Sequence, residues 1–371
     1  MFMGRPTRAE VDLSAIRKNM LSTKSLLKPG TKFCAVIKAD GYGHGAVEVG
    51  RVAESVGADY LAVAILDEAV ALRQAGFKLP ILILGYTPEY QHGEVAAQGL
   101  TQTIFNLKQA EALSAAGSAA GVRVKTHLKI DSGMGRLGVQ PGQAADFAIK
   151  VAALPGLELE GVFTHFAKAD SADKAYTYKQ FEAFTLALAA IKERGLEIPI
   201  KHCANSATTL DLPEMHLDMV RTGIILYGLW PSDEVSHPIE LYPAMRLKTR
   251  VAQLKDVPAG TCLSYGCTFV TGKPSKIATL PIGYADGWSR SLTGKAEIVV
   301  AGQRAPLAGR ICMDQCIADV SGVPGVEEGS EVLLFGAPEL LADEVAAHLG
   351  TINYEIVCMV GKRVPRIYTG E

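Results

Sequence analysis

The chain lacks the features that mark membrane, secreted and nucleic-acid-binding proteins. Its longest apolar stretches, such as residues 60–66 and 223–230, are far too short to span a bilayer. Residues 1–10 are charged and no apolar run follows them, which argues against a secretory signal. The formal net charge is −2 and the charges are mixed, so no global field favours nucleic acid or an anionic membrane. We therefore expect a cytoplasmic protein with neither partner.

Cysteine is sparse and follows no ligand pattern. The seven cysteines are an odd number scattered through a long chain, which fits reduced thiols in a cytoplasm. Cys312 and Cys316 are four residues apart, which is not a zinc-knuckle spacing, and no second pair follows. The sequence therefore predicts no metal site.

What is present is an alternation of short apolar runs and longer amphipathic segments over the first 230 residues. The predicted strands are residues 32–37, 60–65, 81–84, 102–105, 124–130, 159–164, 198–202 and 219–226. The predicted helices are residues 46–56, 66–75, 107–120, 143–153 and 176–194. Strands separated by helices indicate a parallel sheet. Eight such strands can close into an α/β barrel, which we predict, although an open doubly wound sheet satisfies the same local pattern.

The pattern changes after residue 231. Residues 245–251 alternate apolar and basic side chains with a period of two, which indicates a strand. Further strand-like runs are residues 276–280, 297–300, 305–313 and 331–335, and only residues 341–349 look helical. We predict an α/β barrel over residues 1–240 and a mostly β domain over residues 241–371. The first ten or so residues are a segment that can pack on the second domain.

Polar residues gather where the predicted strands end. In such folds ligands bind at the carboxyl ends of the strands. The segments at those ends are residues 38–45, 129–136, 164–166 and 202–206, together with Asp218 and Arg221 in the eighth strand region. Basic, hydroxyl and glycine-rich groups thus converge on one face. That composition fits an anionic, phosphate-bearing ligand.

Lys38 is the sharpest single feature of these segments. It follows the apolar run 34–37, so its amine should be partly desolvated, which lowers the pKa of the amine and favours Schiff-base chemistry. The alternative is a lysine that extends along the strand end to reach water. The following glycines, Gly41, Gly43 and Gly45, favour a ligand site because they let backbone approach it closely.

Three other features have two interpretations each. Residues 133–138 match the spacing GxGxxG, but they follow the fifth strand rather than the first, so a turn presenting Arg136 is preferred to a dinucleotide site. His165 is either a core histidine or a functional group. Ser206 precedes an apolar stretch and is a candidate helix N-cap, a position that can also bind phosphate.

Taken together, these segments resemble the bacterial alanine racemases, which use pyridoxal 5'-phosphate (PLP) and have a type III fold. The matching segments are residues 38–45, 131–138, 164–166, 202–207, 264–266, 283–287, 309–315, 354–356 and 363–368. They occur in one order over essentially the whole chain. The resemblance implies an eight-stranded α/β barrel followed by a β domain, and a homodimer in which the β domain of one subunit completes the active site of the other. It implies interconversion of L- and D-alanine, which supplies D-alanine for peptidoglycan.

The resemblance also implies the residues of the site. Lys38 would be the Schiff-base lysine and one catalytic base, and Tyr265 of the partner subunit would be the second. The implied cofactor-binding residues are Lys38, Tyr42, Arg136, His165, Ser206, Arg221, Gly223, Ile224 and Tyr354. Of these, Arg221 would bond the pyridine nitrogen, His165 would lie against the ring and Arg136 would contact the phenolic oxygen. The residues near the cofactor phosphate would be Tyr42, Ser206, Gly223, Ile224 and Tyr354. The implied substrate-binding residues are Arg136, Met313 and Tyr284, with His202 and Asp314 behind the site. Lys129 matches a position often found carbamylated.

Arginine beside the pyridine nitrogen has a chemical consequence. Because a guanidinium is effectively always protonated, Arg221 must donate and leaves that nitrogen without a proton. The ring is then a weaker electron sink, which disfavours side reactions such as transamination and suits racemisation. Two bases on opposite faces, Lys38 and Tyr265, would serve both directions of proton transfer.

The chain departs from the family pattern at Thr222, Cys267 and Asn353, where proline, arginine and proline are common. These positions affect substrate range and stability rather than the residues assigned to chemistry. Three alternatives remain: a racemase of serine or broad range, a decarboxylase on a similar barrel, and a non-catalytic PLP-binding protein. The last lacks a β domain, which this chain is predicted to have.

Overall fold

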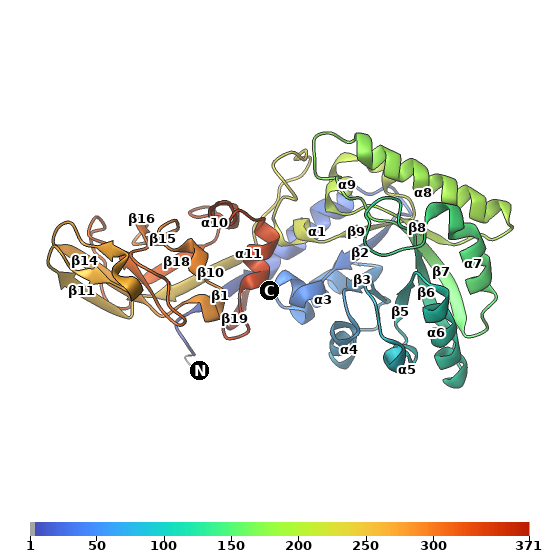
Figure 1. The fold of residues 1–371 in the computed structure, drawn as a ribbon, viewed down its shortest axis with the longest axis horizontal. Coiled ribbons are helices and arrows are strands. Elements are labelled where there is room, and N and C mark those ends of the chain that lie inside the picture. The colour runs from blue at the N-terminus through green and yellow to red at the C-terminus, as the bar shows by residue number, and fades with distance from the viewer. Residues whose placement is uncertain (1–3, 371) are drawn as a thin grey trace. The chain divides into compact units, whose positions relative to one another are not determined.

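The computed structural model describes residues 4–370, and the chain forms two compact units (Figure 1). The barrel unit comprises Ile16–Gly41 and Ala46–Tyr242. The β unit comprises Tyr42–Gly45 and the described parts of Met1–Ala15 and Pro243–Glu371. The division thus falls between Tyr242 and Pro243, compared with the predicted boundary between residues 240 and 241. The first three residues of the predicted barrel domain and Glu371 lie outside the described residues.

The barrel unit contains an eight-stranded parallel sheet with helices around it (Figure 1, blue to yellow). Its strands are β2 (Lys32–Val36), β3 (Tyr60–Val63), β4 (Ile81–Ile83), β5 (Thr101–Ile104), β6 (Val124–Lys129), β7 (Leu157–Phe163), β8 (Ile200–His202) and β9 (Met219–Thr222). The helices associated with it are α1 (Leu13–Ser25), α2 (Lys38–Tyr42), α3 (Ala46–Ser55), α4 (Leu66–Gln74), α5 (His92–Ala97), α6 (Leu107–Ala119), α7 (Ala144–Ala152), α8 (Ala175–Glu193) and α9 (Ser206–Asp211). Short 3-10 turns are η1 (Glu89–Gln91), η2 (Pro141–Gln143), η3 (Pro213–Met215) and η4 (Ile224–Tyr227).

The two ends of the strand order, β8 and β9, meet. The order is β8-β7-β6-β5-β4-β3-β2-β9. The backbone N–H of Asp218 donates to the carbonyl of Lys201 at 3.0 Å, and that of Arg221 donates to the carbonyl of Ala204 at 3.0 Å. These bonds bring the edges of the sheet into a nearly closed barrel. The predicted fold class is confirmed, and the open sheet is excluded.

Helix α1 was not predicted, because polar side chains interrupt its buried face. Asn19 and Thr23 are fully buried among the apolar residues of that face. The Asn19 side chain donates to the carbonyl of Tyr242 at 2.9 Å and accepts the Tyr242 N–H at 2.8 Å. A hydropathy pattern assigns every polar residue to the surface, so it misplaces a polar residue that is buried and hydrogen-bonded. Helix α5 was also missed, and α9 was expected only through the candidate N-cap at Ser206, since six residues are too few to show a helical period.

The β unit contains three sheets. The largest has the order β16-β15-β18-β10-β1-β19, and smaller ones are β11-β14-β17 and β12-β13. The strands are β1 (Arg8–Asp12), β10 (Met245–Arg250), β11 (Gln253–Val257), β12 (Cys262–Leu263), β13 (Phe269–Val270), β14 (Ser275–Leu280), β15 (Glu297–Val300), β16 (Gln303–Pro306), β17 (Cys316–Asp319), β18 (Glu331–Phe335) and β19 (Arg366–Thr369). The helical segments are η5 (Tyr265–Cys267), η6 (Tyr284–Asp286), η7 (Arg290–Leu292), α10 (Ala342–Leu349) and α11 (Asn353–Met359).

Two expectations for this unit were wrong. Residues 341–349 are not the only helical segment, because α11 follows α10 as a seven-residue helix too short to show a period. The run 305–313 is not one strand, since β16 ends at Pro306 and residues 308–313 form a loop.

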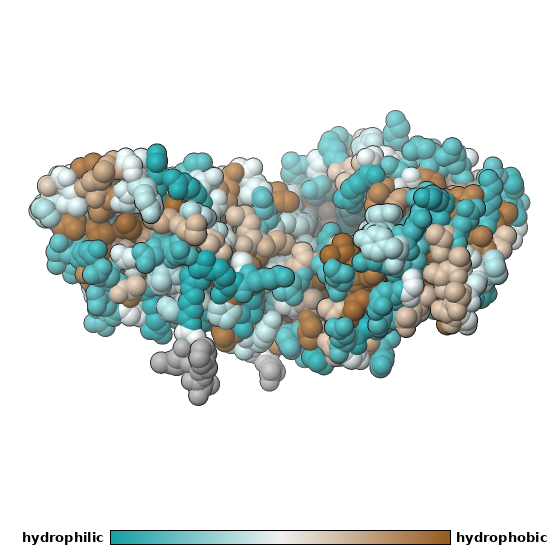
Figure 2. Space-filling view, turned by 60° about the horizontal axis from the view of Figure 1, so that its bottom comes forward, coloured by the Kyte–Doolittle hydropathy of each residue, from teal (hydrophilic) through white to brown (hydrophobic). Residues whose placement is uncertain are grey.

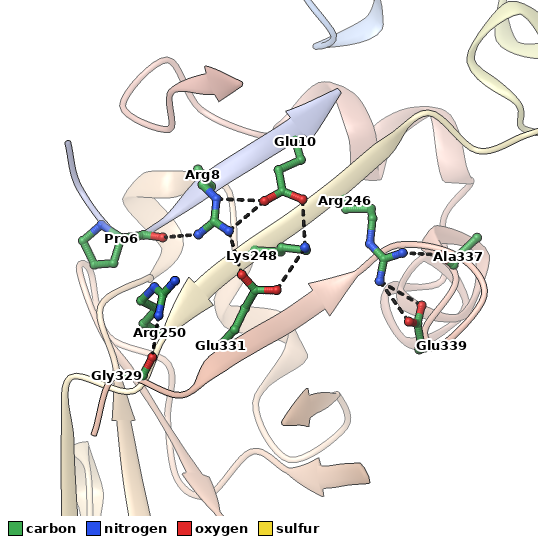
Figure 3. A network of polar contacts seen from close by, with 10 residues as sticks. All are labelled: Pro6, Arg8, Glu10, Arg246, Lys248, Arg250, Gly329, Glu331, Ala337 and Glu339. Atoms are coloured by element: carbon green, nitrogen blue, oxygen red, sulfur yellow. Dashed lines mark hydrogen bonds and ion pairs between the residues drawn. The ribbon is translucent and has the colours of Figure 1, made fainter. Parts of the chain in front are cut away.

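An N-terminal strand that the sequence pattern did not predict is held in this unit by backbone and charge. β1 pairs with β10 in an antiparallel and with β19 in a parallel arrangement. Arg8 and Lys248 each form ion pairs with both Glu10 and Glu331, at 2.7–3.0 Å (Figure 3). Since β18 carries Glu331, this alternation of charges joins three neighbouring strands on one face of the sheet.

The surface carries no long apolar element. None of the helices in residues 4–370 is long and apolar enough to cross a membrane. The face drawn in Figure 2 is mostly hydrophilic, with smaller hydrophobic patches between.

Candidate active site

Lys38 begins a turn with unusual backbone geometry. After β2, Ala39, Asp40 and Gly41 all have left-handed helical angles, with φ between 52° and 61°. For residues other than glycine this conformation costs roughly 1–2 kcal/mol each, so the surrounding structure must hold it. The N–H of Gly41 donates to the carbonyl of Ile37 at 2.8 Å, and the N–H of Ala39 donates to the Glu68 carboxylate at 2.6 Å. The lysine predicted from sequence therefore lies on a strained turn tied to its own barrel.

Arg221 on β9 is the most buried cation of the barrel unit's candidate site, with 4% of its surface exposed. Its Nη1 donates to His202 Nδ1 at 2.8 Å, and its Nη2 donates to the carbonyl of Thr164 at 3.0 Å. Nη2 also lies 3.3 Å from His165 Nδ1. Burial lowers the pKa of Arg221 to about 10, so it stays charged at neutral pH. Among residues 4–370 no carboxylate forms an ion pair with it. Arg221 is thus positioned by neutral acceptors.

His165 reports where the cationic side chains lie. Burial, and then the charges of Arg221 and Lys129, lower the pKa of His165 well below its usual value. Arg136 and Lys38 contribute to the same shift. The imidazole is therefore neutral at neutral pH, and four basic residues from three strand ends, those of β2, β6 and β9, lie within electrostatic reach of it. This convergence was predicted from the sequence.

Lys129, the last residue of β6, is buried and its amine is unsatisfied. Only 6% of its surface is exposed, and Nζ has no hydrogen-bond partner among the residues described. Nζ lies 4.7 Å from the centre of the Phe163 ring. Burial, and then the charges of Arg221 and Arg136, lower the pKa of Lys129 well below its usual value. The shift favours the neutral, nucleophilic form of the amine.

The segment 133–138 is a loop shaped by Asp131. One carboxylate oxygen of Asp131 accepts the backbone N–H groups of Gly133, Met134 and Gly135 at 2.8–3.1 Å. Burial alone would raise the pKa of Asp131, but these hydrogen bonds outweigh it and lower the pKa. No helix begins within the segment, so it lacks the strand–turn–helix arrangement of a dinucleotide site. The loop instead carries Arg136, whose side chain is exposed.

Ser206 is buried at the start of α9, but it is not the N-cap. Asn205 is the cap, and its Oδ1 accepts the N–H of Thr208 at 3.0 Å. The N-cap interpretation of Ser206 was wrong by one residue, because both side chains suit a cap and the pattern could not separate them. The Ser206 hydroxyl instead accepts the N–H of Gly223 at 2.9 Å, next to Ile224 at the start of η4. The three predicted phosphate-contacting residues of the barrel unit are therefore adjacent.

Tyr42 and Tyr354, two further predicted phosphate contacts, both belong to the β unit. Their ring centres are 6.1 Å apart. Tyr42 is 7% exposed, and burial raises the pKa of its hydroxyl above the usual value. Its carbonyl lies 2.9 Å from His44 Nδ1, and the carbonyl of Gly43 accepts Arg366 Nε at 2.9 Å. These contacts tie residues 42–45 to the C-terminal part of the unit.

Tyr265 lies on an exposed, sharply turned segment. Its side chain is 66% exposed, and its neighbours Ser264, Gly266 and Cys267 all have positive φ. The Ser264 hydroxyl donates to the carbonyl of Arg310 at 2.5 Å. A disulfide joins Cys262 to Cys267, with the Cα atoms 5.0 Å apart. The turn is thus closed on both sides of Tyr265.

This disulfide corrects the expectation that the thiols are all reduced. Cysteine spacing suggested no pairing, because the contact depends on the turn at residues 264–267 rather than on a ligand motif. Cys34, Cys203, Cys312 and Cys316 are free thiols. The two paired cysteines lie on either side of Tyr265, the candidate base. One sign of them was visible in the sequence: Cys267 stands where the family frequently has arginine.

Met313 and Tyr284 come from two loops joined by backbone hydrogen bonds. The N–H of Tyr284 donates to the carbonyl of Cys312 at 3.1 Å, and that of Ala285 donates to the carbonyl of Met313 at 3.0 Å. Met313 is 53% and Tyr284 39% exposed. Asp314 forms an ion pair with Arg363 at 2.7 Å. The predicted substrate residues of the β unit therefore lie together.

Tyr265 and Cys312 line an open groove of about 760 Å³ in the β unit, together with Ser264 and Gln315. Only part of the predicted set is gathered within each unit. The barrel unit brings together Lys129, His165, His202, Ser206, Arg221, Gly223 and Ile224, with Lys38 and Arg136 in electrostatic reach. The β unit holds Tyr42, Tyr265, Tyr284, Met313, Asp314 and Tyr354.

Sequence reasoning missed Glu68, His127 and Glu160. Glu68 was passed over because a glutamate in the first turn of a helix usually caps that helix, yet here it also binds the Ala39 N–H. His127 and Glu160 contact each other across two strands, in a pairing that local patterns do not contain. For His127 and Glu160, the available signal was a polar residue within a predicted strand.

Known proteins match this chain over almost its whole length. Residues 11–231 match the family model described as alanine racemase, N-terminal domain, and residues 244–368 match alanine racemase, C-terminal domain. An alanine racemase of Desulfovibrio desulfuricans is 62% identical over 98% of both chains. The structure of an alanine racemase from Clostridium difficile 630 superposes with a TM-score of 0.97 at 44% identity, covering 99% of this chain and 96% of that one. Its complex with cycloserine gives a TM-score of 0.95 at 42% identity, covering 100% and 97%.

Proposed function

The chain belongs to the alanine racemase family, and on that premise we propose that it interconverts L- and D-alanine with PLP, using Lys38 and Tyr265 as its two bases. The observation that carries the proposal is the buried guanidinium of Arg221, which forms no ion pair with a carboxylate among the described residues and has further basic side chains near it. Such a cluster suits an anionic cofactor held by neutral and cationic groups. It opposes chemistry that needs a protonated pyridine nitrogen.

The residues present fit PLP. The buried Lys129 amine has no hydrogen-bond partner in residues 4–370, and Arg136 and Arg221 act on it electrostatically. Ser206, Gly223 and Ile224 are adjacent and would hold the phosphate, to which Tyr42 and Tyr354 would add their hydroxyls. When bound, PLP makes the proton on the amino acid Cα acidic by delocalising the resulting charge.

Lys38 and Tyr265 would move the proton. Lys38 holds the cofactor and exchanges a proton with one face of Cα at its Nζ, and Tyr265 of the partner subunit does so at the other face with its hydroxyl oxygen. The tyrosine is 66% exposed in the chain, which leaves its hydroxyl available to a second subunit. We therefore propose a homodimer with shared active sites. Met313 and Tyr284 would bound the substrate pocket from the same side.

Arg221 and His165 would orient the ring. Arg221 would donate a hydrogen bond to the pyridine nitrogen and, because the guanidinium is protonated, would leave that nitrogen without a proton. His202, which accepts from Nη1, fixes the plane of the guanidinium. Neutral His165 suits contact with the ring face, because it adds no further positive charge. Racemisation is then favoured over transamination.

We propose that Lys129 is carbamylated. Its neutral amine attacks carbon dioxide to form a carbamate and releases one proton, which replaces an unsatisfied amine with an anion beside Arg136 and Arg221. Arg136 is then held against the phenolic oxygen of the cofactor. Labelled carbon dioxide should give one carbamate carbon signal by 13C NMR, absent in Lys129→Gln. If the wild-type protein gives no such signal, the carbamate is excluded.

The cellular role follows from the reaction. D-alanine made in the cytoplasm would supply peptidoglycan synthesis.

The test is direct formation of D-alanine. Purified protein with PLP is incubated with L-alanine, and the product is separated by chiral chromatography, with L-serine as a second substrate. We expect D-alanine from the wild type and a loss of at least about 10⁴-fold in Lys38→Ala, which also lacks the bound-cofactor absorbance. Cofactor bound without conversion of either amino acid would leave only a PLP-binding protein. A serine rate above the alanine rate would reassign the substrate.

A further inference from the structure

A chain of polar contacts runs from Arg221 through the interior of the barrel. Arg221 Nη1 is 2.8 Å from His202 Nδ1, and His202 Nε2 is 2.8 Å from His127 Nδ1. His127 Nε2 is in turn 3.7 Å from the carboxylate of Glu160. His127 and His202 are fully buried, and the Glu160 side chain is 12% exposed. The chain therefore begins at the cofactor-facing arginine and ends at a carboxylate.

The donors in this chain have one consistent direction. Arg221 can only donate, so His202 Nδ1 must be unprotonated. Burial, and then the charge of Arg221, lower the pKa of His202, so the ring is neutral and carries its proton on Nε2. That proton is donated to His127 Nδ1. Burial also lowers the pKa of His127, which places the proton of His127 on Nε2, facing Glu160.

Glu160 is charged at the end of the chain. Burial alone would raise the pKa of Glu160, but His127 and Lys125 lower it to about 2. Lys125 Nζ lies 2.7 Å from one carboxylate oxygen. The other oxygen, Oε2, and His127 Nε2 face each other, and neither has a hydrogen-bond partner among residues 4–370. At this end of the chain of contacts, the buried donor His127 Nε2 therefore faces the buried acceptor Glu160 Oε2 at 3.7 Å.

The surrounding structure keeps space for the two rings. Gly161 lies opposite His127 in the register of β6 and β7. A Cβ atom at Gly161 would approach the His127 ring to 2.6 Å, so any side chain there would displace it. The ring of Phe163 stacks on that of His202, with centres 4.8 Å apart and planes 9° from parallel. Strand β7, which carries Glu160, thus leaves room for the ring of His127 and packs a phenyl ring against that of His202.

We propose that Glu160, acting through His127 and His202, is a positioning residue for Arg221. A carboxylate at His127 Nε2 strengthens Nδ1 of that ring as an acceptor, and the same polarisation passes to His202 Nδ1. The acceptor of Arg221 Nη1 is then strong and fixed. The inference rests on the proposed function, in which Arg221 bonds the pyridine nitrogen.

Loss of the carboxylate should weaken the hold on Arg221 without removing substrate contacts. In Glu160→Gln we expect kcat to fall roughly tenfold while KM for alanine changes less than about twofold. A loosely held Arg221 lets the pyridine nitrogen gain a proton. The ratio of pyruvate to D-alanine formed should therefore rise.

His127→Asn tests whether the effect passes through the imidazole. Asparagine can place its carbonyl oxygen near the position of Nδ1 and still accept from His202, but it cannot reach Glu160. We expect His127→Asn to match Glu160→Gln, and the double variant to be no worse than either single one. Independent, multiplicative losses in the double variant would overturn the proposal.

Glu158→Gln is the matched control, because it removes the same charge from the same strand two residues away. It should leave kcat and the pyruvate ratio at wild-type values. Equal impairment in Glu158→Gln would mean a general charge effect. Wild-type behaviour of Glu160→Gln would exclude Glu160 from positioning Arg221.

The proton positions can be measured without cofactor or turnover. In cofactor-free wild-type protein labelled with 15N-histidine, His127 and His202 should both show a protonated Nε2 and an unprotonated Nδ1. Glu160→Gln should shift the Nδ1 signal of His202, and Glu158→Gln should not. A proton on His127 Nδ1 would overturn the chain even if no variant folds. Failure of the wild type to form D-alanine would instead reject the proposed function and leave this result intact.

Discussion

Two pairs of candidate site residues, one pair from each unit, differ sharply in exposure. In the barrel unit, Arg221 and Lys129 are 4% and 6% exposed, and each lies on a strand. In the β unit, Tyr265 and Met313 are 66% and 53% exposed, and both lie on turns. The barrel residues are ordered by the fold of one chain. The turn residues have their side chains free, which is what a site completed by a second subunit requires.

This difference explains which part of the site is preorganised. Buried Arg221 is oriented by neutral acceptors before any ligand binds, which favours binding with little rearrangement. In the proposed dimer, exposed Tyr265 and Met313 would gain their surroundings only on assembly. The predictions below test this division between the two units, beginning with the largest effect.

Mixed dimers should recover activity that neither parent has. Lys38→Ala and Tyr265→Phe homodimers are each expected to be inactive. If each site combines Lys38 of one subunit with Tyr265 of the other, a hybrid has one intact site, so random exchange should restore about a quarter of wild-type activity. The two variants are refolded together, and the formation of D-alanine from L-alanine is measured.

The control for this experiment is each variant refolded alone. No recovery in the mixture, with hybrids verified by a tag on one variant, would mean that both bases come from the same chain. The exposure of Tyr265 would then need an explanation other than a site shared between two subunits.

Acid should unfold the barrel unit before the β unit. Five imidazoles whose pKa is lowered, chiefly by burial, lie in the barrel unit: His92, His127, His165, His202 and His216. The unfolded state binds more protons below a pKa of about 6.5. Stability is therefore present above that pH and is lost as pH falls, by up to about 1.4 kcal/mol per pH unit for each imidazole.

The two tryptophans can report this order, because Trp230 lies in the barrel unit and buried Trp288 in the β unit. Fluorescence of Trp230→Phe follows the β unit, and its difference from the wild type follows the barrel. We expect the difference signal to change at the higher pH. A change in the Trp288 signal first would reverse the assignment.

Reduction of the Cys262–Cys267 disulfide should lower activity moderately. The bond closes the turn that carries Tyr265, and opening it adds freedom to a base whose position matters. We expect kcat to fall roughly threefold with a dithiol reductant or in Cys267→Ser, with cofactor binding unchanged. Cys358→Ser, which replaces an exposed cysteine of the same unit, is the control. Full activity after verified reduction would contradict a role in holding Tyr265.

The smallest effect is expected at the charged face of the β unit's large sheet. Lys248 pairs with Glu10 and Glu331 (Figure 3). Lys248→Met should reduce the free energy of unfolding by about 1 kcal/mol or less, because the pairs are partly exposed. Urea unfolding measures it, with exposed Lys255→Met as the control. A loss well above that size would show that β1 depends on this network for docking.

The local patterns of the sequence were sufficient for most of the barrel. All eight predicted strands overlap observed ones, because strands buried on both faces read as apolar runs. The patterns failed where polar residues are inside, as in α1, and where elements are short, as in α5, α9 and α11. The strand β1 was missed as well, although its burial alternates.

Residue chemistry and motif order determined the candidates: Lys38, Arg221 and Tyr265 were all identified without coordinates. Tertiary structure alone decided how they are held. The left-handed turn after Lys38 depends on Glu68, the orientation of Arg221 on His202 and His127, and the closed turn at Tyr265 on two cysteines that pair through space. The reason is physical. Residue type fixes what a side chain can donate or accept, whereas its partner, burial and protonation depend on residues far away in the chain.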